Sequence, residues 1–299
     1  MLDTIIQRIR HIRTYVISSI ARNLRNNLVK QCMATTTNEE TGGNMNNSNK
    51  SSIMIRNTKL GGKHTLICVP IMEDTIRESI LACERAVLFN PDMVEARIDK
   101  IVDTDKDIIP SMLLNMRKLL GDKPLIATYR SVTEGGWGNM PPREIYELYK
   151  EIIEESDIDI LDIEMSMDRK IVAKLQQLCR DKGVKVMFSH HNFEDTPEEP
   201  EILSILKEGE RLGGDISKIA LMPNNGKDVL KLLNATYAAK TELSIPFVAI
   251  SMGKKGKISR MGAGVFGSAL TFAQADHNPS APGQISIQEM RDILNCLEE

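Results

Sequence analysis

The sequence lacks several features that would assign it to a specialised class of protein. No run of about 18 consecutive apolar residues occurs in the chain, which argues against a transmembrane helix. The five cysteines are scattered, odd in number and without a CxxC pair, so they indicate neither a disulfide framework nor a zinc site and favour a reducing compartment. The net charge of −3 over 299 residues is far from the basic excess of a nucleic-acid-binding protein. With 41% hydrophobic and 26% charged residues, the composition is that of a globular protein.

The charge is unevenly distributed along the chain. Residues 1–52 contain seven basic and three acidic residues, a net charge of +4, so the other 247 residues carry −7. A polar tract rich in Asn, Ser, Thr and Gly ends this leader and is typical of a flexible linker. Before it, apolar residues recur at steps of three and four, as in an amphipathic helix: Ile5, Ile9, Ile12, Val16, Ile20, Leu24 and Leu28.

The basic leader has four interpretations. Residues 1–32 resemble an organelle transit peptide, and they also have the pattern of a helix that binds a membrane surface. The leader is equally consistent with an appendage unrelated to the chemistry, or with translation that starts at Met33. We expect a cytoplasmic protein, with organelle targeting as the alternative, and a single domain over residues 53–299.

From residue 53 onward, short β-prone runs alternate with longer helical stretches. Eight strand–helix units occupy the 247 residues. The predicted strands are residues 65–71, 93–98, 124–130, 158–164, 184–189, 216–222, 246–251 and 268–274. Because these runs are almost continuously apolar, they predict parallel strands covered by helices. Eight units in about 250 residues favour an α/β fold of the closed (β/α)8 TIM-barrel type over an open doubly wound sheet.

Two residues near strand ends carry the sharpest chemical prediction. In a (β/α)8 barrel, polar side chains at the carboxyl ends of the strands form the active site. Lys218 lies within an apolar strand, where burial favours a neutral, nucleophilic amine that can form an imine with a ketone. His191 titrates near neutral pH and suits proton transfer. The alternatives are a solvated lysine at the barrel rim and a structural histidine.

Other polar side chains end the remaining strands. They are Glu95, Arg97, Arg130, Glu134, Asp162, Glu164, Ser259, Arg260, Ser280 and Gln284. Three arginines that end different strands suggest a carboxylate or phosphate on the substrate. Ion pairs with Glu95, Glu134 and Glu164 explain the same arginines nearly as well.

Two further motifs lack the context that their chemistry requires. The segment Gly262–Gly267 matches G-x-G-x-x-G, but it does not directly follow a strand, as a dinucleotide-binding loop would. The segment His190–Asp195 is rich in metal-binding residue types, yet adjacent residues of an extended chain point to opposite sides. No second group of ligands with suitable spacing accompanies it, so we expect no metal.

The strand-end residues, taken in order, resemble the type I 3-dehydroquinate dehydratase family. The similar segments are VEARID (94–99), ATYRSVTEGG (127–136), DIE (162–164), FSHHNFEDTP (188–197), DISKIALMP (215–223), MGKKGKISRMGAGVFGSALTFA (252–273) and SAPGQI (280–285). They occur in the order of the family and span almost the whole chain from residue 53. The resemblance implies a (β/α)8 barrel, a short β-hairpin at residues 53–63, a homodimer, and dehydration of 3-dehydroquinate to 3-dehydroshikimate, a step of aromatic amino acid biosynthesis.

Carried over by position, the resemblance also assigns roles to single residues. Lys218 becomes the imine-forming lysine and His191 the general acid and base, with Glu134 orienting the histidine. Arg260 would bind the substrate carboxylate. The substrate hydroxyl groups would be held by Glu95, Arg97, Arg130, Ser280 and Gln284. Asp162 and Glu164 would support these residues from behind, and the reaction needs no metal or organic cofactor.

The sequence departs from the family pattern at a few positions that carry no reacting group. Ala96, Lys100 and Asn192 replace residue types that are more common there, and Pro279 lengthens the loop before Ser280. Two other functions remain alternatives. A class I aldolase also uses an imine-forming lysine in this barrel, and a catalytically inactive barrel could sense a ligand. Neither nucleic acid nor a membrane, apart from the basic leader, is an expected partner.

Overall fold

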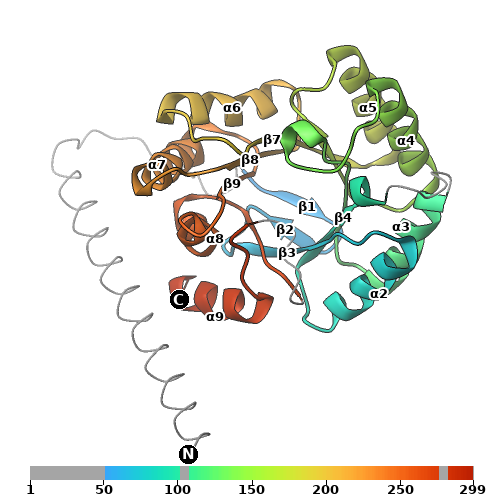
Figure 1. The fold of residues 1–299 in the computed structure, drawn as a ribbon, viewed down its shortest axis with the longest axis horizontal. Helices are drawn as coiled ribbons and strands as arrows, with labels where there is room; N and C mark the ends of the chain where they lie inside the picture. Colours follow the sequence, from blue (N-terminus) through green and yellow to red (C-terminus); the bar gives the residue numbers. More distant parts are fainter. Residues whose placement is uncertain (1–50, 102–107, 276–281, 299) are drawn as a thin grey trace, which may run out of the picture.

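The computed structural model describes residues 51–101, 108–275 and 282–298 (Figure 1). The amphipathic helix and most of the polar linker predicted for the leader lie outside these ranges. Both therefore stay predictions, as does the domain boundary at residue 52. Within the described ranges, no helix is both long and apolar enough to cross a bilayer.

Eight parallel strands form one sheet in the order β10-β3-β4-β5-β6-β7-β8-β9. The strands are β3 (Leu66–Ile71), β4 (Met93–Arg97), β5 (Leu125–Thr128), β6 (Ile160–Glu164), β7 (Lys185–Asn192), β8 (Ile216–Leu221), β9 (Phe247–Ser251) and β10 (Leu270–Phe272). The first and last strands of this order, β10 and β9, share no hydrogen-bonded ladder. They are joined by one backbone hydrogen bond, in which the N–H of Ala269 donates to the carbonyl of Phe247 at 2.8 Å. The nearly closed barrel confirms the predicted (β/α)8 fold and rules out the open sheet.

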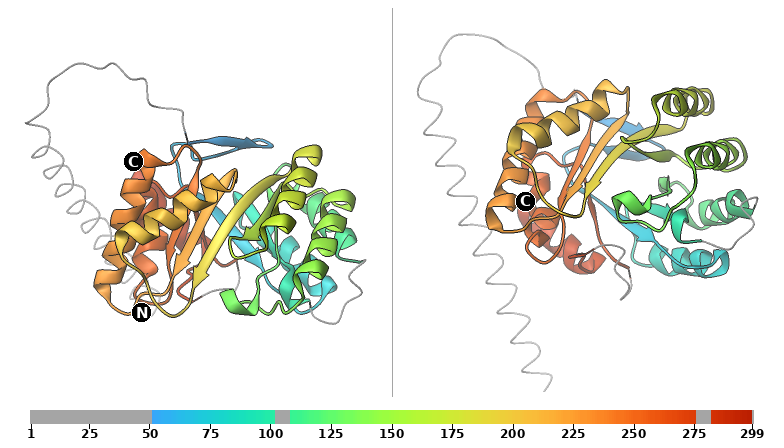
Figure 2. Two further views of the ribbon diagram at one scale, coloured as in Figure 1. Left: turned by 90° about the horizontal axis from the view of Figure 1, so that it is seen from above. Right: turned by 45° about the horizontal axis from the view of Figure 1, so that its top comes forward.

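Helices cover the outside of the barrel (Figures 1 and 2). They are α2 (Ile76–Val87), α3 (Ile109–Leu120), α4 (Pro142–Glu155), α5 (Arg169–Lys182), α6 (Glu199–Arg211), α7 (Gly226–Glu242), α8 (Lys257–Gly262) and α9 (Ile287–Glu298), with short 3-10 turns η1 (Ile98–Lys100), η3 (Val132–Glu134) and η4 (Ala263–Phe266). Their ends follow local rules. At α5, for example, Asp168 accepts hydrogen bonds from the first turn, and Gly183 ends the helix at φ 75°.

The predicted N-terminal hairpin is present and closes the amino end of the barrel. Its strands, β1 (Ile53–Ile55) and β2 (Thr58–Leu60), pair antiparallel. Ile55 and Leu60 are buried in the same apolar cluster as the inward side chains at the start of the barrel strands. Figure 2 shows the hairpin lying across that end, away from the carboxyl ends of the strands. The opposite end is therefore the one that holds the strand-end polar residues.

Alternation along the strands stacks two layers inside the barrel. Because side chains of a strand point to opposite faces in turn, residues two apart share the interior. The lower layer is apolar, and five strands then place a polar residue two positions further on. The pairs are Met93 and Glu95, Ile126 and Thr128, Ile160 and Asp162, Met187 and Ser189, and Ile216 and Lys218. A layer of buried apolar side chains thus lies directly below a layer of buried polar side chains.

One strand boundary differs from the sequence prediction in a way that matters for the site. The sequence predicts that a strand ends at Ser189, but β7 continues to Asn192. The reason is the partner strand, since β8 pairs with β7 up to the register Asn192↔Leu221. The extension puts His191 on an inward position, two residues beyond Ser189, and turns His190 to the outside.

Candidate active site

Lys218 lies inside the barrel and not at its rim. Its residue is 4% exposed, and its Nζ is 3.3 Å from Glu95 Oε1 and 3.2 Å from Asp162 Oδ2. Nζ also lies 4.6 Å from the centroid of the Phe272 ring. A protonated Lys218 donates to both carboxylates, whereas a nucleophilic amine requires that this proton leave. The two acceptors hold Nζ in one place.

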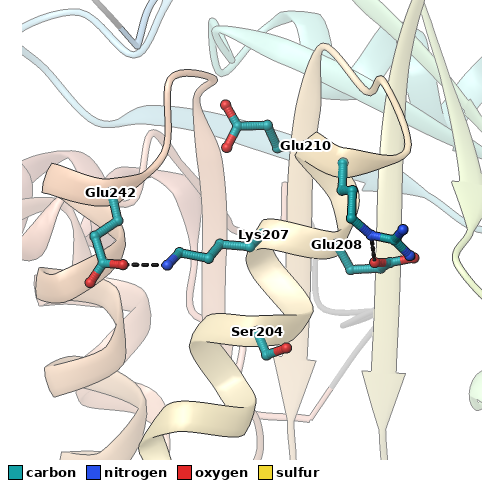
Figure 3. A pocket seen from close by; sticks show the side chains of 6 residues that line it. Ser204, Lys207, Glu208, Glu210 and Glu242 are labelled. Atoms are coloured by element: carbon teal, nitrogen blue, oxygen red, sulfur yellow. Dashed lines mark hydrogen bonds and ion pairs between the residues drawn. The ribbon is translucent and has the colours of Figure 1, made fainter.

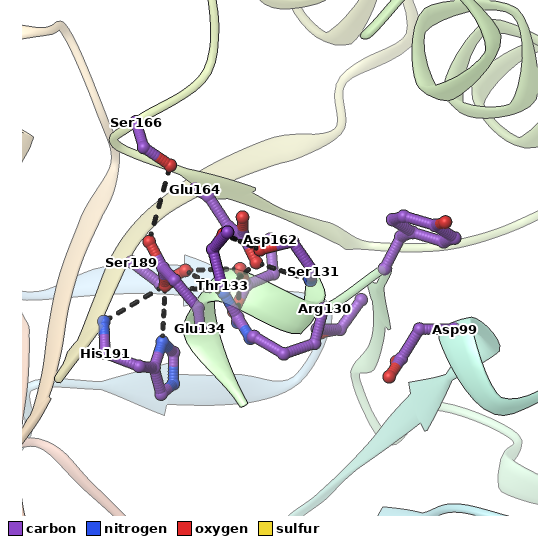
Figure 4. Close-up of polar contacts among 12 residues, drawn as sticks. Asp99, Arg130, Ser131, Thr133, Glu134, Asp162, Glu164, Ser166, Ser189 and His191 are labelled. Carbon is purple, nitrogen blue, oxygen red and sulfur yellow. Dashed lines mark hydrogen bonds and ion pairs between the residues drawn. The ribbon is translucent and has the colours of Figure 1, made fainter. Parts of the chain in front are cut away.

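His191 on the neighbouring strand β7 is partly buried and forms a pair with the buried Glu134 of the loop after β5 (Figure 4). The ring Nδ1 of His191 is 2.9 Å from Glu134 Oε2, and the backbone N–H of His191 donates to the same oxygen at 3.0 Å. When Nδ1 carries the proton and donates it to Glu134, Nε2 is left as a proton acceptor. Burial lowers the pKa of His191 well below 6.5, and the positive charges of Arg130 and Lys218 lower it further.

The loop after β5 brings Glu134 to this histidine. The turn η3 is closed by a hydrogen bond from Glu134 N to the Ser131 carbonyl at 3.1 Å. Gly135 follows with φ of 78°, in the left-handed region. A Cβ at this position would lie 2.3 Å from the ring of Phe193. The glycine is therefore required both by the backbone conformation and by the close approach of Phe193.

Arg130 occupies the centre of the polar layer and is 3% exposed. Its Nη1 donates to Glu134 at 3.2 Å and to Glu164 at 3.0 Å, and its Nη2 donates to Asp162 at 2.8 Å. Nη1 also donates to Ser189 Oγ at 3.0 Å. Burial alone would lower the pKa of Arg130, but the surrounding carboxylates outweigh it and raise this pKa. The ion pairs considered for this arginine are thus present for Glu134 and Glu164, with Asp162 as a third.

The carboxyl of Glu134 has a perturbed affinity for protons. Burial raises its pKa to about 8, against the opposing charge of Arg130 and with support from Glu164 and Asp162. Asp162 behaves differently, because the charges of Arg130 and Lys218 and a hydrogen bond from Ser189 overcome its burial and lower its pKa. The site therefore holds two neighbouring carboxyls with opposite tendencies, an arrangement typical of acid–base sites.

The other two predicted arginines have different surroundings. Arg97 pairs with Asp99 through two hydrogen bonds of 2.8 and 2.9 Å, a partner that the sequence did not indicate. Arg260 is 3% exposed, and within the described chain its Nη2 donates to the Pro282 carbonyl at 3.2 Å while its buried Nε has no partner. Burial lowers the pKa of Arg260 to about 10. A buried guanidinium with no carboxylate in hydrogen-bond contact is suited to an anion from outside.

The remaining substrate-binding predictions fall around Arg260 and Lys218. Gln284 is 8% exposed and follows Pro282, the residue that accepts from Arg260. Glu95 accepts from Lys218 and, at 2.9 Å, from the Thr128 hydroxyl. Ser280 lies outside the described residues, so its position stays a prediction. Among the residues that the structure describes, no cluster of three or more His, Cys, Asp or Glu side chains is arranged to hold a metal ion.

Sequence reasoning underrated Asp162, gave no role to Ser189 at the end of its strand, and missed Phe272. Asp162 was expected to act from behind, yet it contacts Lys218 directly. The signal was present in the alternation, since Asp162 and Ser189 each follow an inward apolar residue by two positions. The position of Phe272 under the Lys218 ammonium depends on how far strands are staggered, which spacing along one strand does not contain.

A cavity of about 320 Å³ lies elsewhere, between α6 and α7 (Figure 3). It is lined by five residues of α6 between Ser204 and Arg211 and by Glu242 at the end of α7, and none of the strand-end site residues lines it. Its charged side chains are paired with one another, Lys207 with Glu242 and Arg211 with Glu208. Surface ion pairs of this kind contribute little even to stability, and this cavity holds no lysine–histidine pair like that of Lys218 and His191. The active-site assignment therefore follows the chemistry of the barrel interior and not this cavity.

Fold and site together define an enzyme built on a (β/α)8 barrel. The model of the type I 3-dehydroquinase family matches residues 67–299. A 3-dehydroquinate dehydratase of Alkaliphilus oremlandii is 38% identical over 253 residues, covering 84% of this chain and 98% of the relative. The chain belongs to the type I 3-dehydroquinase family.

Solved structures agree with this assignment. The 3-dehydroquinate dehydratase of Geobacillus kaustophilus superposes with a TM-score of 0.80 at 33% identity, covering 84% of this chain and 98% of that one. The type I enzyme of Clostridium difficile, solved with covalently modified comenic acid, gives a TM-score of 0.79 at 36% identity over 83% of this chain and 98% of that one. The family predicted from the strand-end residues is confirmed.

The lowered pKa of His191 gives a prediction for its titration. We expect NMR of protein labelled with ¹⁵N-histidine to show a neutral His191 ring at pH 6.5, with a midpoint clearly below the ordinary histidine value. A His191→Asn variant identifies the resonance. A base must be unprotonated to accept a proton, and the lowered pKa keeps the His191 ring neutral as the pH falls through 6.5. We therefore expect His191 to remain able to accept a proton at that pH. A midpoint at or above 6.5 would contradict the electrostatic description of the site.

Proposed function

We propose that this enzyme is a hydro-lyase that dehydrates 3-dehydroquinate to 3-dehydroshikimate in the shikimate pathway, through an imine on Lys218. The observation that carries the proposal is a buried lysine at the carboxyl ends of the barrel strands, next to the His191–Glu134 pair. Membership of the type I family supports the substrate and the reaction. The neutral His191 ring supports the proton transfers that dehydration requires.

Binding of the substrate would use the one buried arginine described here without an acidic partner. Arg260 would hold the carboxylate of 3-dehydroquinate with its unused Nε donor, and Ser280 and Gln284 would close around it. Glu95 and Arg97 would hold hydroxyl groups. Arg130 would add its own Nε–H, because its Nη1 and Nη2 atoms already donate to the protein.

The reaction would proceed in balanced steps. The neutral Lys218 amine adds to the ketone and gives a carbinolamine. The carbinolamine takes up one proton from water, its hydroxyl group leaves as water, and an iminium ion remains; the same proton is released when the imine is finally hydrolysed. The iminium is a better electron sink than the ketone, so the neighbouring C–H becomes acidic enough for His191 to remove its proton. His191, now protonated, returns that proton to the departing hydroxyl group as water leaves. Hydrolysis of the conjugated imine releases the enone and restores Lys218. Glu134 keeps the ring of His191 in place throughout.

The two alternative functions fit the site less well. A class I aldolase would commonly bind a phosphate group in the loops after the last two strands. In this chain those loops supply one buried arginine, Arg260, which suits a small carboxylate. A ligand-sensing barrel needs neither a buried lysine nor a polarised histidine, and this chain has both.

We also propose a cytoplasmic homodimer, as the family resemblance implies. Leu230 and Tyr237 are 59% and 56% exposed on the outer face of α7, which is the kind of apolar surface that a second chain covers. Sedimentation velocity would give the mass of two chains if the proposal is right and of one chain if it is wrong.

Substitution of the reacting residues tests the proposed chemistry. With 3-dehydroquinate, the wild type should produce the ultraviolet absorbance of a conjugated enone, and borohydride should trap the substrate on Lys218. Lys218→Ala should abolish both signals. His191→Ala should still be labelled slowly but should lose about 10²- to 10⁴-fold in dehydration, the usual contribution of a general base. Absence of enone with the wild type, or a label on another residue, would overturn the proposal.

Substitution of Arg260 tests the carboxylate site separately. A charge-assisted hydrogen bond contributes about 1.5–3 kcal/mol, so Arg260→Ala should raise KM by about 10- to 100-fold. Arg260→Lys keeps the positive charge but lacks the planar guanidinium, so its KM should lie between those of the wild type and Arg260→Ala. Steady-state kinetics measures both, with far-ultraviolet circular dichroism to verify folding. An unchanged KM in a folded Arg260→Ala protein would exclude this role.

A further inference from the structure

Among the described residues, Asp162 is the one whose side chain is hydrogen-bonded to the side chains of both Lys218 and Arg130. Its Oδ1 accepts from Arg130 Nη2 at 2.8 Å and from the Ser189 hydroxyl at 2.6 Å. Its Oδ2 is 3.2 Å from Lys218 Nζ. The side chain is 1% exposed, so solvent screens none of these contacts appreciably. One oxygen is thus fixed by two donors, and this fixation aims the other oxygen at the reacting nitrogen.

The backbone explains why this oxygen reaches Lys218. Asp162 pairs with Thr128 on one side and Met187 on the other, in the middle of the sheet, so its Cα is fixed by two ladders. Lys218 pairs with Ser189, the residue that also donates to Asp162. Both side chains therefore point into the barrel interior with β7 between them. The short side chain of aspartate leaves its carboxylate little freedom to turn away.

The charged surroundings of Lys218 can be described strand by strand. On β4 Glu95 is its second carboxylate partner, and on β3 Cys68 is a buried thiol whose pKa burial raises well above its usual value. On β7 His191 is neutral at physiological pH. The loop after β5 supplies Arg130, and β10 supplies only the Phe272 ring. Neighbouring β9 places the apolar Val248 beside Lys218. Among the described residues, the carboxylates of Glu95 and Asp162 are thus the two groups that accept a hydrogen bond from Lys218 Nζ.

We propose that Asp162 is a positioning residue for imine formation: clamped by Arg130 and Ser189, its carboxylate fixes the direction of Lys218 Nζ and places a negative charge beside that nitrogen. The inference rests on the proposed function in that Lys218 is the nucleophile. No new bond is made or broken by Asp162 itself. Its lowered proton affinity is consistent with a permanent anion and not with a proton carrier.

The charge part of this inference can be tested without substrate. Cyanate is small, it carbamylates a lysine in its neutral form and not its protonated form, and the product can be followed by peptide mass spectrometry. The ratio of carbamylation at Lys218 to that at exposed Lys254, measured across pH, gives the midpoint of Lys218 deprotonation. Loss of an opposite charge at this distance shifts a midpoint by roughly one to three pH units. Asp162→Asn should therefore make Lys218 reactive at a pH lower by at least about one unit, which is tenfold more neutral amine at a fixed pH.

Two matched variants separate charge from geometry. Glu164→Gln removes a carboxylate that also contacts Arg130, at 3.0 Å, but that does not contact Lys218, so it should shift the Lys218 midpoint much less. Asp162→Glu keeps the charge and moves the oxygens, so its midpoint should stay near that of the wild type.

The positioning part requires turnover. Although Asp162→Asn makes the amine more available, kcat should fall at least tenfold, and Asp162→Glu should lower kcat without moving the midpoint. Equal midpoint shifts in Asp162→Asn and Glu164→Gln, or wild-type kcat in both Asp162 variants, would overturn the inference. If the wild type instead fails to form enone while the carbamylation shifts occur as expected, the proposed function fails and the charge relation stands.

Discussion

The balance of charge around Arg130 is the constraint on which the rest of the site depends. Three carboxyl groups are buried within hydrogen-bond distance of one guanidinium, at 2.8 to 3.2 Å. Without a positive charge at the centre, burying them together would be strongly unfavourable. Two of them have a second contact in the site, because Glu134 is hydrogen-bonded to His191 and Asp162 to Lys218. Arg130 therefore links His191, the predicted acid–base residue, to Lys218, the predicted nucleophile. The link runs through Glu134 on the side of His191 and through Asp162 on the side of Lys218.

The barrel makes this arrangement available by simple alternation. A layer of buried apolar side chains, covered below by the N-terminal hairpin, forms the floor of the site. One step higher on the same strands lie the polar residues, so that desolvation strengthens their interactions and fixes their side chains. The asymmetry among the arginines follows from the same layer. Arg97 and Arg130 are matched by acids within the chain, whereas the described chain offers Arg260 a single backbone carbonyl. Arg260 is thus the arginine of the described site that remains for the carboxylate of the proposed substrate.

Most of the fold was predictable because it depends on local pattern. The eight apolar runs and intervening helices gave the barrel, and the strand-end residues gave the family, which the comparisons confirm. Partners across the barrel were not predictable, since they depend on strand stagger. For that reason the sequence paired the arginines with three glutamates. In the structure Glu134 and Glu164 do pair with Arg130, but Glu95 pairs with Lys218, and the arginines gain Asp162 and Asp99 as partners. The end of β7 was misplaced because the length of β8, and not the residues after Ser189, decides how far the ladder extends.

The most direct test of the central claim is the pH dependence of the unfolding free energy of Arg130→Met, measured against the wild type with urea at pH 8 and pH 5. Removing the guanidinium leaves buried carboxylates without their partner, so we predict a loss of about 3–5 kcal/mol at pH 8. In the variant the folded-state pKa values of Glu134 and Asp162 rise, so the folded protein takes up protons as the pH falls and the loss becomes smaller at pH 5. A loss below about 1 kcal/mol, or one that is the same at both pH values, would contradict the account.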